Sequence, residues 1–164
     1  MISLAKKTGY GLIALTHLAG TNEACVSARA IAAEYGVPVS LLMNVLKVLS
    51  AAGFVRSWRG PRGGYSLARP ADQITLAEVI ETIEGPIHFV ACAAGDSDVR
   101  QQDLCGLVAR CPIHDPVCRI HEKMRRFLRD ITIEDLAGGR EPAARAEPCE
   151  LGVGFHVGED PDLS

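Results

Sequence analysis

Apolar residues recur at helical spacing in three stretches near the start of the chain. Residues 3–20 carry Leu, Ile and Ala at intervals of three and four, which predicts a helix with a wide apolar face. Residues 28–35 predict a short second helix. A third helix is expected over 40–52, with Ser40 as its N-cap and Gly53 at its end. Two helices joined by a short turn have the arrangement of a helix-turn-helix.

The pattern changes from helical spacing to alternation after the third helix. Residues 54–58 alternate apolar and polar side chains, and residues 65–68 have the composition of a returning strand. The loop between them, residues 59–64, is rich in Gly and Arg. Two strands around such a loop predict a β-wing beside the helix-turn-helix. Thr75 is then expected to cap a further helix that ends before Gly85.

A long amphipathic helix is predicted farther along the chain. Residues 87–116 show neither helical nor strand periodicity, whereas Asp115 and Pro116 are typical of a helix start. The apolar positions that follow advance by three and four residues, as they do in paired helices: Val117, Ile120, Met124, Phe127 and Ile131. No other predicted element is long enough to cover this stripe, so we expect it to join two copies of the chain. The helix is expected to close at residues 135–137.

Together these elements predict a mainly α fold with a small β-wing. We expect a winged helix-turn-helix domain over residues 1–86, a loop and dimerisation helix over 87–137, and a flexible tail over 138–164. The chain has 164 residues, of which 48% are hydrophobic and 23% charged, and this composition suits a globular domain with a tail. It excludes a wholly disordered, collagen-like or coiled-coil chain.

The sequence contains no feature of a membrane protein or of an enzyme. No apolar run approaches the ~18 residues of a membrane span, and polar residues interrupt the first helix in a way that argues against a signal peptide. A cytoplasmic protein is therefore expected. No nucleotide-binding loop, nucleophile elbow or His-Glu-x-x-His motif is present, so we expect neither catalysis nor a small-molecule substrate.

The net charge of −3 conceals a marked asymmetry along the chain. Residues 1–70 hold eight basic and two acidic side chains, a net charge of +6, whereas the remainder carries −9. A basic half of this kind is typical of a module that binds a polyanion. Double-stranded DNA is the partner that a helix-turn-helix with a basic wing favours. A winged helix used only for protein contacts is the alternative.

The residues expected to meet DNA lie on the third helix and in the loop of the wing. Asn can pair with adenine, and Ser or Lys can reach phosphates or guanine in the major groove. The arginines of the loop can reach a phosphate or enter the minor groove, while its glycines let the backbone turn tightly and approach the duplex. The predicted contacts are Ser40, Leu41, Asn44, Lys47, Arg59, Arg62, Gly63 and Gly64.

Four of the six cysteines fall within 27 residues: Cys92, Cys105, Cys111 and Cys118. Because the cytosol keeps thiols reduced, a disulfide framework is not expected there, and clustered cysteines more often bind a metal or act in redox chemistry. Thiolates are the usual ligands of both iron–sulfur clusters and zinc. The absence of a Cys-x-x-Cys motif counts against a small iron–sulfur electron carrier or a thiol redox enzyme.

The motif Arg-Gly-Pro-Arg-Gly-Gly-Tyr over 59–65 gives the chain a family resemblance. Together with Leu-Thr-His-Leu-Ala-Gly at the end of the first helix, Ile-Glu-Gly at 83–85 and the downstream cysteines, it resembles the Rrf2 family of bacterial transcriptional regulators over about residues 1–137. The resemblance implies a winged helix-turn-helix homodimer joined through a long C-terminal helix. Many members bind an iron–sulfur cluster through three cysteines in the loop before that helix, and they sense iron–sulfur supply, nitric oxide or iron.

The resemblance also implies a set of cluster ligands. The spacing of Cys105 and Cys111 matches the family, and Cys92 is the natural first cysteine, although it lies farther from Cys105 than is usual. His114 follows Cys111 in the Cys-x-x-His pattern of members in which a histidine completes a [2Fe–2S] site. A [4Fe–4S] cluster is the alternative cofactor. Other members use a carboxylate from the first helix, but Gly9 stands at that position and cannot ligate.

The fourth ligand is contested between His114 and Cys118. With Asp115 as N-cap, Cys118 would lie in the first helical turn, where the helix dipole favours a thiolate. His114 would lie in the loop, free to turn toward Cys111, and is therefore the preferred ligand. Structural zinc in the same ligands, or a simple thiol switch without a metal, remain as alternatives.

Overall fold

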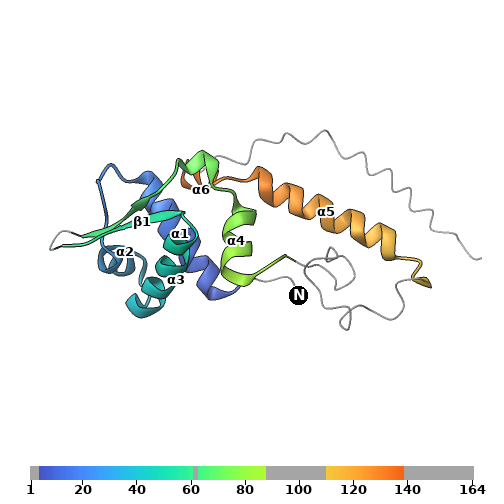
Figure 1. Ribbon diagram of the computed structural model, residues 1–164, viewed down its shortest axis with the longest axis horizontal. Helices are drawn as coiled ribbons and strands as arrows, with labels where there is room; N and C mark the ends of the chain where they lie inside the picture. The colour runs from blue at the N-terminus through green and yellow to red at the C-terminus, as the bar shows by residue number, and fades with distance from the viewer. Residues whose placement is uncertain (1–3, 61–62, 88–109, 139–164) are drawn as a thin grey trace, which may run out of the picture.

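The structure is a computed structural model that describes residues 4–60, 63–87 and 110–138. Its elements follow one another as α1 (Lys6–Gly20), α2 (Ala28–Tyr35), α3 (Val39–Ala51), β1 (Val55–Trp58), β2 (Gly64–Leu67), the short 3₁₀ helix η1 (Ala71–Gln73), α4 (Leu76–Glu84), α5 (His114–Asp130) and α6 (Ile133–Gly138). Helices dominate, and β1 and β2 form a two-stranded hairpin that projects from them (Figure 1). The predicted fold class, mainly α with a small β-wing, is confirmed.

The core forms where α1, α2 and α3 pack together. Leu15 of α1, Ile31 of α2 and the residues Leu42 and Leu46 of α3 are completely buried there. Gly11 lets α1 approach its neighbours closely, because a Cβ at this position would lie 2.7 Å from Cδ1 of Ile83 in α4. The fold therefore fixes α3 rigidly by its inner face.

The start of α3 differs from the prediction. Pro38, not Ser40, is its N-cap, and the Pro38 carbonyl accepts a hydrogen bond from the amide of Leu42 at 3.1 Å. Proline presets the backbone φ angle that this tight connection needs. Ser40 therefore already lies in the first turn of α3, with its side chain exposed.

The hairpin is antiparallel and pairs Val55 with Leu67 at one end and Trp58 with Gly64 at the other. A backbone bridge between Val26 and Tyr65 adds the segment before α2 to its edge, with two N–H···O bonds of 2.9 and 2.8 Å. The wing is thus tied to the helix-turn-helix by its backbone and not only by side chains.

The helix α4 is capped at its start by its own residues and is joined to α1 at its end. Thr75 caps α4 as predicted, in a reciprocal capping box with Glu78. At the other end of α4, the Glu84 carboxylate accepts hydrogen bonds from the amide of Ala5, at 2.9 Å, and from the hydroxyl of Thr8. Ala5 has no side chain that could cap α1, so a carboxylate from α4 performs that function.

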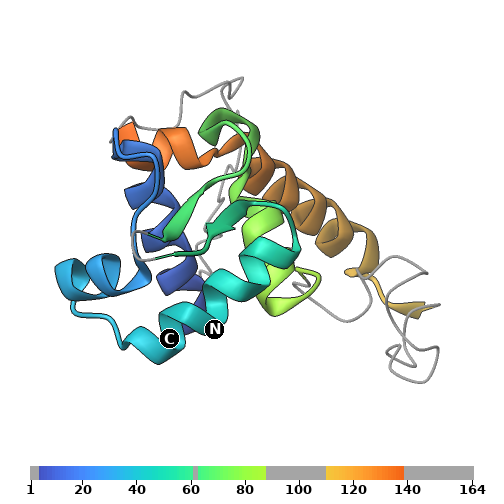
Figure 2. The same cartoon turned by 60° about the vertical axis from the view of Figure 1, so that its left-hand side comes forward.

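The C-terminal helix is shorter than predicted at its far end. It ends at Asp130, and Thr132 begins a new capping box with Asp135 that starts α6. Ile131 and Thr132 instead run beside the segment before α4: the carbonyl of Ile131 accepts from the amide of Leu76 at 2.8 Å. The short helix α6 then packs on α1, while α5 leans away from the core with α4 as its neighbour (Figures 1 and 2).

None of the helices in the described ranges is long and apolar enough to cross a membrane.

Candidate nucleic-acid interface and metal centre

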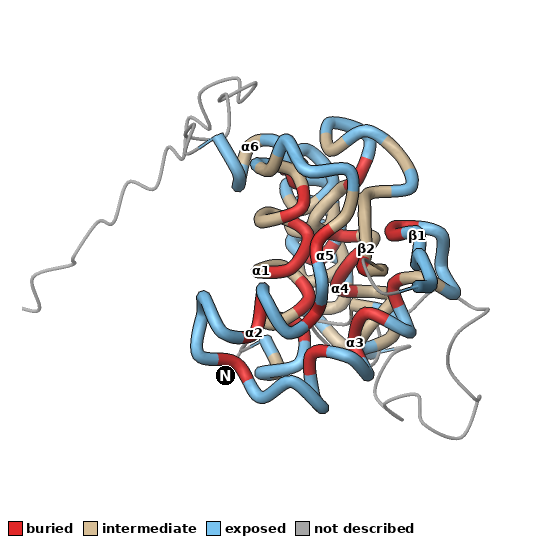
Figure 3. Tube along the Cα trace, turned by 90° about the vertical axis from the view of Figure 1, so that its left-hand side faces the viewer, coloured by how far each residue is buried: buried red, intermediate tan, exposed pale blue. Residues whose placement is uncertain are grey.

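The outer face of α3 carries all four of the side chains singled out on this helix. Ser40, Leu41, Asn44 and Lys47 are exposed, whereas the intervening Leu42, Val45, Leu46 and Leu49 are buried. Buried and exposed segments alternate along α3 in Figure 3. The outer face of the helix is thus mixed: the polar side chains Ser40, Asn44 and Lys47 lie among exposed apolar ones. The polar members are of the kinds with which a recognition helix contacts bases and phosphates.

A shallow hollow of about 320 Å³ lies beside this face. Leu41, Asn44 and Val48 of α3 line one side of it, and Lys6 and Tyr10 of α1 line another. Lys6 is exposed, whereas the neighbouring Lys7 ammonium donates to the carbonyl of Ile83 at 2.8 Å. Lys6 therefore adds an unengaged cation to the α3 face. It was counted in the basic half of the sequence but was not singled out.

The wing presents a second group of side chains. Arg59 is exposed at the end of β1, whereas Arg62 lies outside the described residues. Trp58 is 49% exposed, donates from Nε1 to Ser66 Oγ at 2.9 Å, and lies under the Arg56 guanidinium at 5.9 Å. Neither Arg56 nor Trp58 is among the DNA contacts predicted from the sequence. Arg56 and Trp58 lie two residues apart on β1, so their side chains share one face of the strand. This spacing is the feature of the sequence that could have identified them as a pair.

The two glycines of the wing have a role within the fold. A Cβ on Gly63 would lie 2.3 Å from the carbonyl oxygen of Trp58, and one on Gly64 would lie 2.4 Å from that of Val26. Gly64 is also buried. A side chain at this position would collide with Val26, and the role of Gly64 as a DNA contact stays a prediction.

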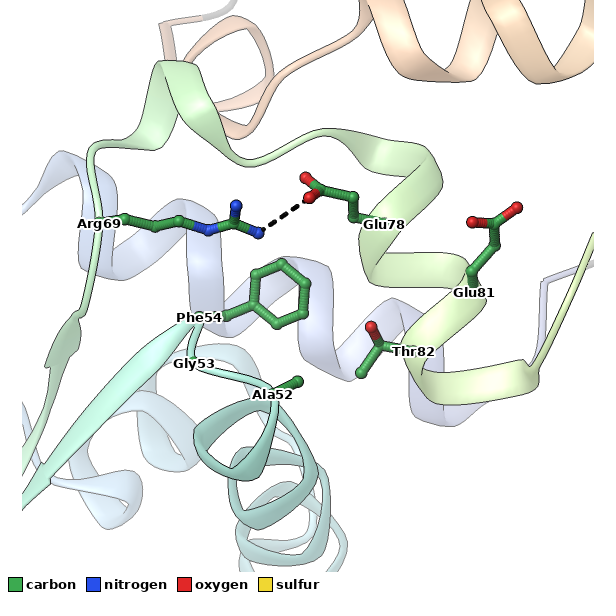
Figure 4. A pocket seen from close by; sticks show the side chains of 7 residues that line it. All are labelled: Ala52, Gly53, Phe54, Arg69, Glu78, Glu81 and Thr82. Atoms are coloured by element: carbon green, nitrogen blue, oxygen red, sulfur yellow. Dashed lines mark hydrogen bonds and ion pairs between the residues drawn. The ribbon is translucent and has the colours of Figure 1, made fainter.

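Arg69 is a half-buried basic residue that is engaged within the fold. Its guanidinium pairs with Glu78 of α4 at 3.2 Å and stacks over the Phe54 ring at 4.7 Å (Figure 4). Partial burial opposes ionisation of Glu78, but the hydrogen bonds from Thr75 and Arg69 outweigh it, so the pKa of Glu78 lies below its usual value. Arg69 thus anchors the base of the wing to α4.

The predicted metal ligands fall into two groups. Cys92 and Cys105 lie outside the described residues, whereas Cys111, His114 and Cys118 lie at the start of α5. His114 Nε2 is 3.7 Å from Cys118 Sγ, and His114 Nδ1 is 3.0 Å from Asp115 Oδ1. Within the described ranges, no group of three or more potential ligands converges on one point.

The position of His114 differs from the prediction that ranked it above Cys118. Ile113 is the N-cap of α5, and Asp115 is not, so His114 is the first helical residue and does not lie in a free loop. The amide of His114 bonds to the carbonyl of Cys111 at 3.3 Å, which closes a turn ahead of the helix. Both contested residues are therefore fixed on the first turns of α5.

The apolar stripe of α5 separates into two parts. His121 is buried, and Arg125 pairs with Glu81 of α4 at 2.9 Å, so one side of α5 faces the rest of the chain. Ile120 and Phe127 of the predicted stripe are 47% and 59% exposed, and Val117 and Met124 are half-buried. Ile131 is corrected: it lies beyond the helix and is buried in the core of its own chain.

Comparison with known proteins places this architecture in a family. The family model for Rrf2, described as an iron-dependent transcriptional regulator, matches residues 4–139. The chain belongs to the Rrf2 family. Its members are transcriptional regulators and not enzymes, so this Rrf2 protein is a transcriptional regulator of the winged helix-turn-helix type.

Relatives of similar length support the assignment. The Rrf2 chain is 32% identical over 140 residues to a Mycobacterium tuberculosis protein named as an HTH-type transcriptional regulator, covering 85% of this chain and 83% of that one. It is 33% identical over 138 residues to Protein aau3 of Rhizobium meliloti, covering 84% and 86%.

Solved structures of two kinds of Rrf2 regulator have the same fold. CymR, the global cysteine regulator of B. subtilis, aligns with a TM-score of 0.67 and 30% identity over 86% of this chain and all of that one. IscR of T. potens aligns with a TM-score of 0.62 and 27% identity over 89% and 93%. The Rrf2 protein therefore shares its architecture with both of these solved regulators.

Proposed function

We propose that this Rrf2 regulator binds double-stranded operator DNA as a homodimer, with α3 in the major groove and the wing beside it. The observation that carries the proposal is the outer face of α3, where Ser40, Leu41, Asn44 and Lys47 are all exposed while the opposite face is buried. Lys6 from α1, together with Arg56 and Arg59 of the wing, extends the same proposal to phosphate contacts.

The homodimer would form through α5. Ile113, Ile120 and Phe127 lie seven residues apart, so they fall on one line along the helix, and all three are exposed. The side of α5 that carries His121 and Arg125 already faces the chain's own residues. A second α5 would cover the line, and a symmetric pair would offer two recognition helices for half-sites about 34 Å apart.

We propose an iron–sulfur cluster as the sensing cofactor, with Cys92, Cys105, Cys111 and His114 as its ligands. A [2Fe–2S] cluster suits a site with a histidine, and [4Fe–4S] is the alternative. Of the proposed ligands, Cys111 and His114 lie within the described residues and offer the thiol and imidazole donors that such a cluster takes. The Asp115 carboxylate lies 3.0 Å from His114 Nδ1, so Nε2 is the ring nitrogen left to ligate. When bound, the cluster supplies a centre that responds to oxidation, nitric oxide or iron supply.

Two ion pairs support a coupling between the proposed metal centre at the start of α5 and the DNA-binding surface. Arg125 of α5 pairs with Glu81 of α4, and Glu78 of α4 pairs with Arg69 at the base of the wing. Any change at the start of α5 that shifts this helix would act on α4 and, through it, on the wing. By linkage, DNA binding would alter the stability of the cluster to the same extent.

The test is the visible absorption of protein purified without oxygen, combined with iron and sulfide analysis. Charge-transfer bands with bound iron and sulfide support the cluster. Colourless protein containing stoichiometric zinc favours the structural-zinc alternative, and protein without metal favours a thiol switch. A DNA-binding assay at several salt concentrations separates all three regulators from a small redox protein, because contacts with phosphates make the affinity for DNA fall steeply with salt.

A further inference from the structure

Two exposed apolar side chains lie on the side of α3 that borders α1. Leu41 and Val48 are 48% and 44% exposed, and both line the hollow of about 320 Å³ that α3 shares with Lys6 and Tyr10. Leu41, Asn44 and Val48 advance by three and four residues, so they lie on one face of the helix with the amide between the two apolar groups. A single exposed leucine needs no explanation, but this grouping suits a partner that has polar and apolar atoms side by side.

The surroundings of the hollow favour a negatively charged partner. Lys6 is exposed at the start of α1, and none of the described residues that line the hollow is acidic. The hollow also continues the outer face of α3, on which Ser40 and Lys47 are exposed. Its occupant is therefore expected to be part of the DNA that the same face meets, and not the apolar surface of another protein.

An A·T base pair presents the matching groups in the major groove. Adenine offers the N7 acceptor and the N6 donor, with which an asparagine amide pairs, and thymine adds the C5-methyl group, which apolar side chains contact. Leu41 and Asn44 are separated by about 4.5 Å along the helix axis, at 1.5 Å per residue. Successive base pairs are about 3.4 Å apart, so the two side chains can reach the same or neighbouring pairs.

We infer that Leu41 contacts the C5-methyl group of a thymine in each operator half-site, in the same base pair as the adenine bound by Asn44 or in the next one. Leu41 is then a specificity-determining residue, Val48 closes the apolar side of the hollow, and Lys6 meets a flanking phosphate. The inference rests on the proposed binding of DNA by α3, which places Leu41 at the interface but gives it no partner. It does not depend on the metal centre.

The experiment removes the methyl group and the side chain separately and together. A duplex selected from random sequences for binding to the full-length wild type is prepared with each thymine replaced in turn by deoxyuridine, which lacks only the C5-methyl group, in both half-sites at once. Fluorescence anisotropy gives the dissociation constants of wild type, Leu41→Ala and Met43→Ala. Met43 is the matched control, because it is an exposed apolar residue of α3, 39% exposed, that is not among the residues lining the hollow.

One thymine position in each half-site should respond to the loss of its methyl group. Burial of one methyl group corresponds to about fourfold in affinity, so its removal from both half-sites should weaken binding by the wild type about 15-fold. In Leu41→Ala the same replacement should have almost no effect, because the side chain that covers the methyl group is gone. Met43→Ala should keep the wild-type response. Each response is a ratio of two affinities of one variant, so a change in the stability of that variant cancels.

Two results would overturn the inference. In the first, no thymine of the selected duplex responds to deoxyuridine in the wild type. In the second, the response is as large in Leu41→Ala as in the wild type, which shows that the methyl group acts through the shape of the duplex and not through Leu41. Either result leaves the proposed function intact, because the wild type still binds a selected duplex. Failure of the wild type to bind any duplex would refute the proposed function and this inference together.

Discussion

At the scale of single residues, the described structure separates basic side chains that are free to meet a polyanion from those that hold the fold. Arg69 is engaged with Glu78 and Phe54, and Lys7 with the carbonyl of Ile83. Lys47 and Arg59 are exposed. The positive charge of the first 70 residues therefore does not all serve one role. Its exposed part lies at the start of α1, on α2 at Arg29, on α3 and on the wing.

Arg59→Ala should weaken DNA binding without affecting the fold, because Arg59 is exposed beside the tip of the wing. If its partner is a phosphate, the loss should be similar for all sequences, and the slope of log affinity against log salt should shrink by about one unit. Fluorescence anisotropy at several salt concentrations measures both quantities. Arg126→Ala, on the exposed face of α5, is the control. Unchanged affinity at moderate salt would remove Arg59 from the interface.

Glu84→Ala should destabilise the protein by about 0.5–1 kcal/mol at pH 7, because the carboxylate caps α1. The hydrogen bonds from Thr8 and Ala5, with the nearby Lys7 charge, lower the pKa of Glu84 against the effect of burial. Its stabilisation is therefore complete above about pH 4.3, the ordinary pKa of Glu, and is lost as the pH falls through the lower folded pKa.

Urea unfolding at pH 7 and at progressively lower pH tests this capping role. The stabilities of wild type and Glu84→Ala should converge as the pH falls below about 4.3. Glu23→Ala is the control, since Glu23 is exposed in the turn after α1. A difference between wild type and Glu84→Ala that stays constant with pH would contradict the role of the charged carboxylate.

At the scale of elements, the sequence predicts what local chemistry determines and misses what tertiary contacts determine. The end of α2 at Gly36 and the start of α4 at Thr75 follow from turn and capping residues. The end of α5 was missed because the apolar spacing continues to Ile131, although Thr132 and Asp135 carry a capping box. Only the contact of Ile131 with the segment before α4 shows that this residue belongs to the core.

The candidate site was predictable to a similar extent. Periodicity alone separates the outer face of α3, with Asn44 and Lys47, from its buried face. It could not show that Gly64 is required by the approach of Val26, because that contact joins segments far apart in the sequence. Nor could it show that His114 and Cys118 lie 3.7 Å apart, since the expected N-cap at Asp115 placed one of them outside the helix.

Glu81→Gln should reduce the coupling between the metal centre and DNA while leaving the protein folded. The pair with Arg125 is partly exposed, so its loss should cost no more than about 1 kcal/mol of stability. The affinity for DNA should then depend less on whether the metal centre is loaded. Glu122→Gln, an exposed carboxylate on α5, is the matched control. If the ratio of the DNA affinities of loaded and metal-free protein is the same in Glu81→Gln as in the wild type, the coupling does not pass through this ion pair.

At the scale of the whole molecule, the unpaired side of α5 requires an explanation. Phe127 is 59% exposed and Ile120 47%, on a helix that leans away from the rest of the chain. Phe127→Asp should therefore yield monomers and abolish tight DNA binding in the same variant, because a single recognition helix makes too few contacts. Sedimentation equilibrium and anisotropy measure the two effects. Arg126→Asp, on the polar side of the same helix, should remain dimeric, and a monomeric wild type with full affinity would refute the dimer.

The central claim is that one metal centre controls the affinity of a dimeric winged helix for DNA. Its most direct test is the dissociation constant for a duplex selected from random sequences, measured without oxygen for loaded and metal-free protein at the same salt concentration. The account predicts two clearly different constants for the wild type, and equal constants after the same treatments once the proposed ligands Cys105 and Cys111 are replaced by Ala. Equal dissociation constants for loaded and metal-free wild type would contradict it.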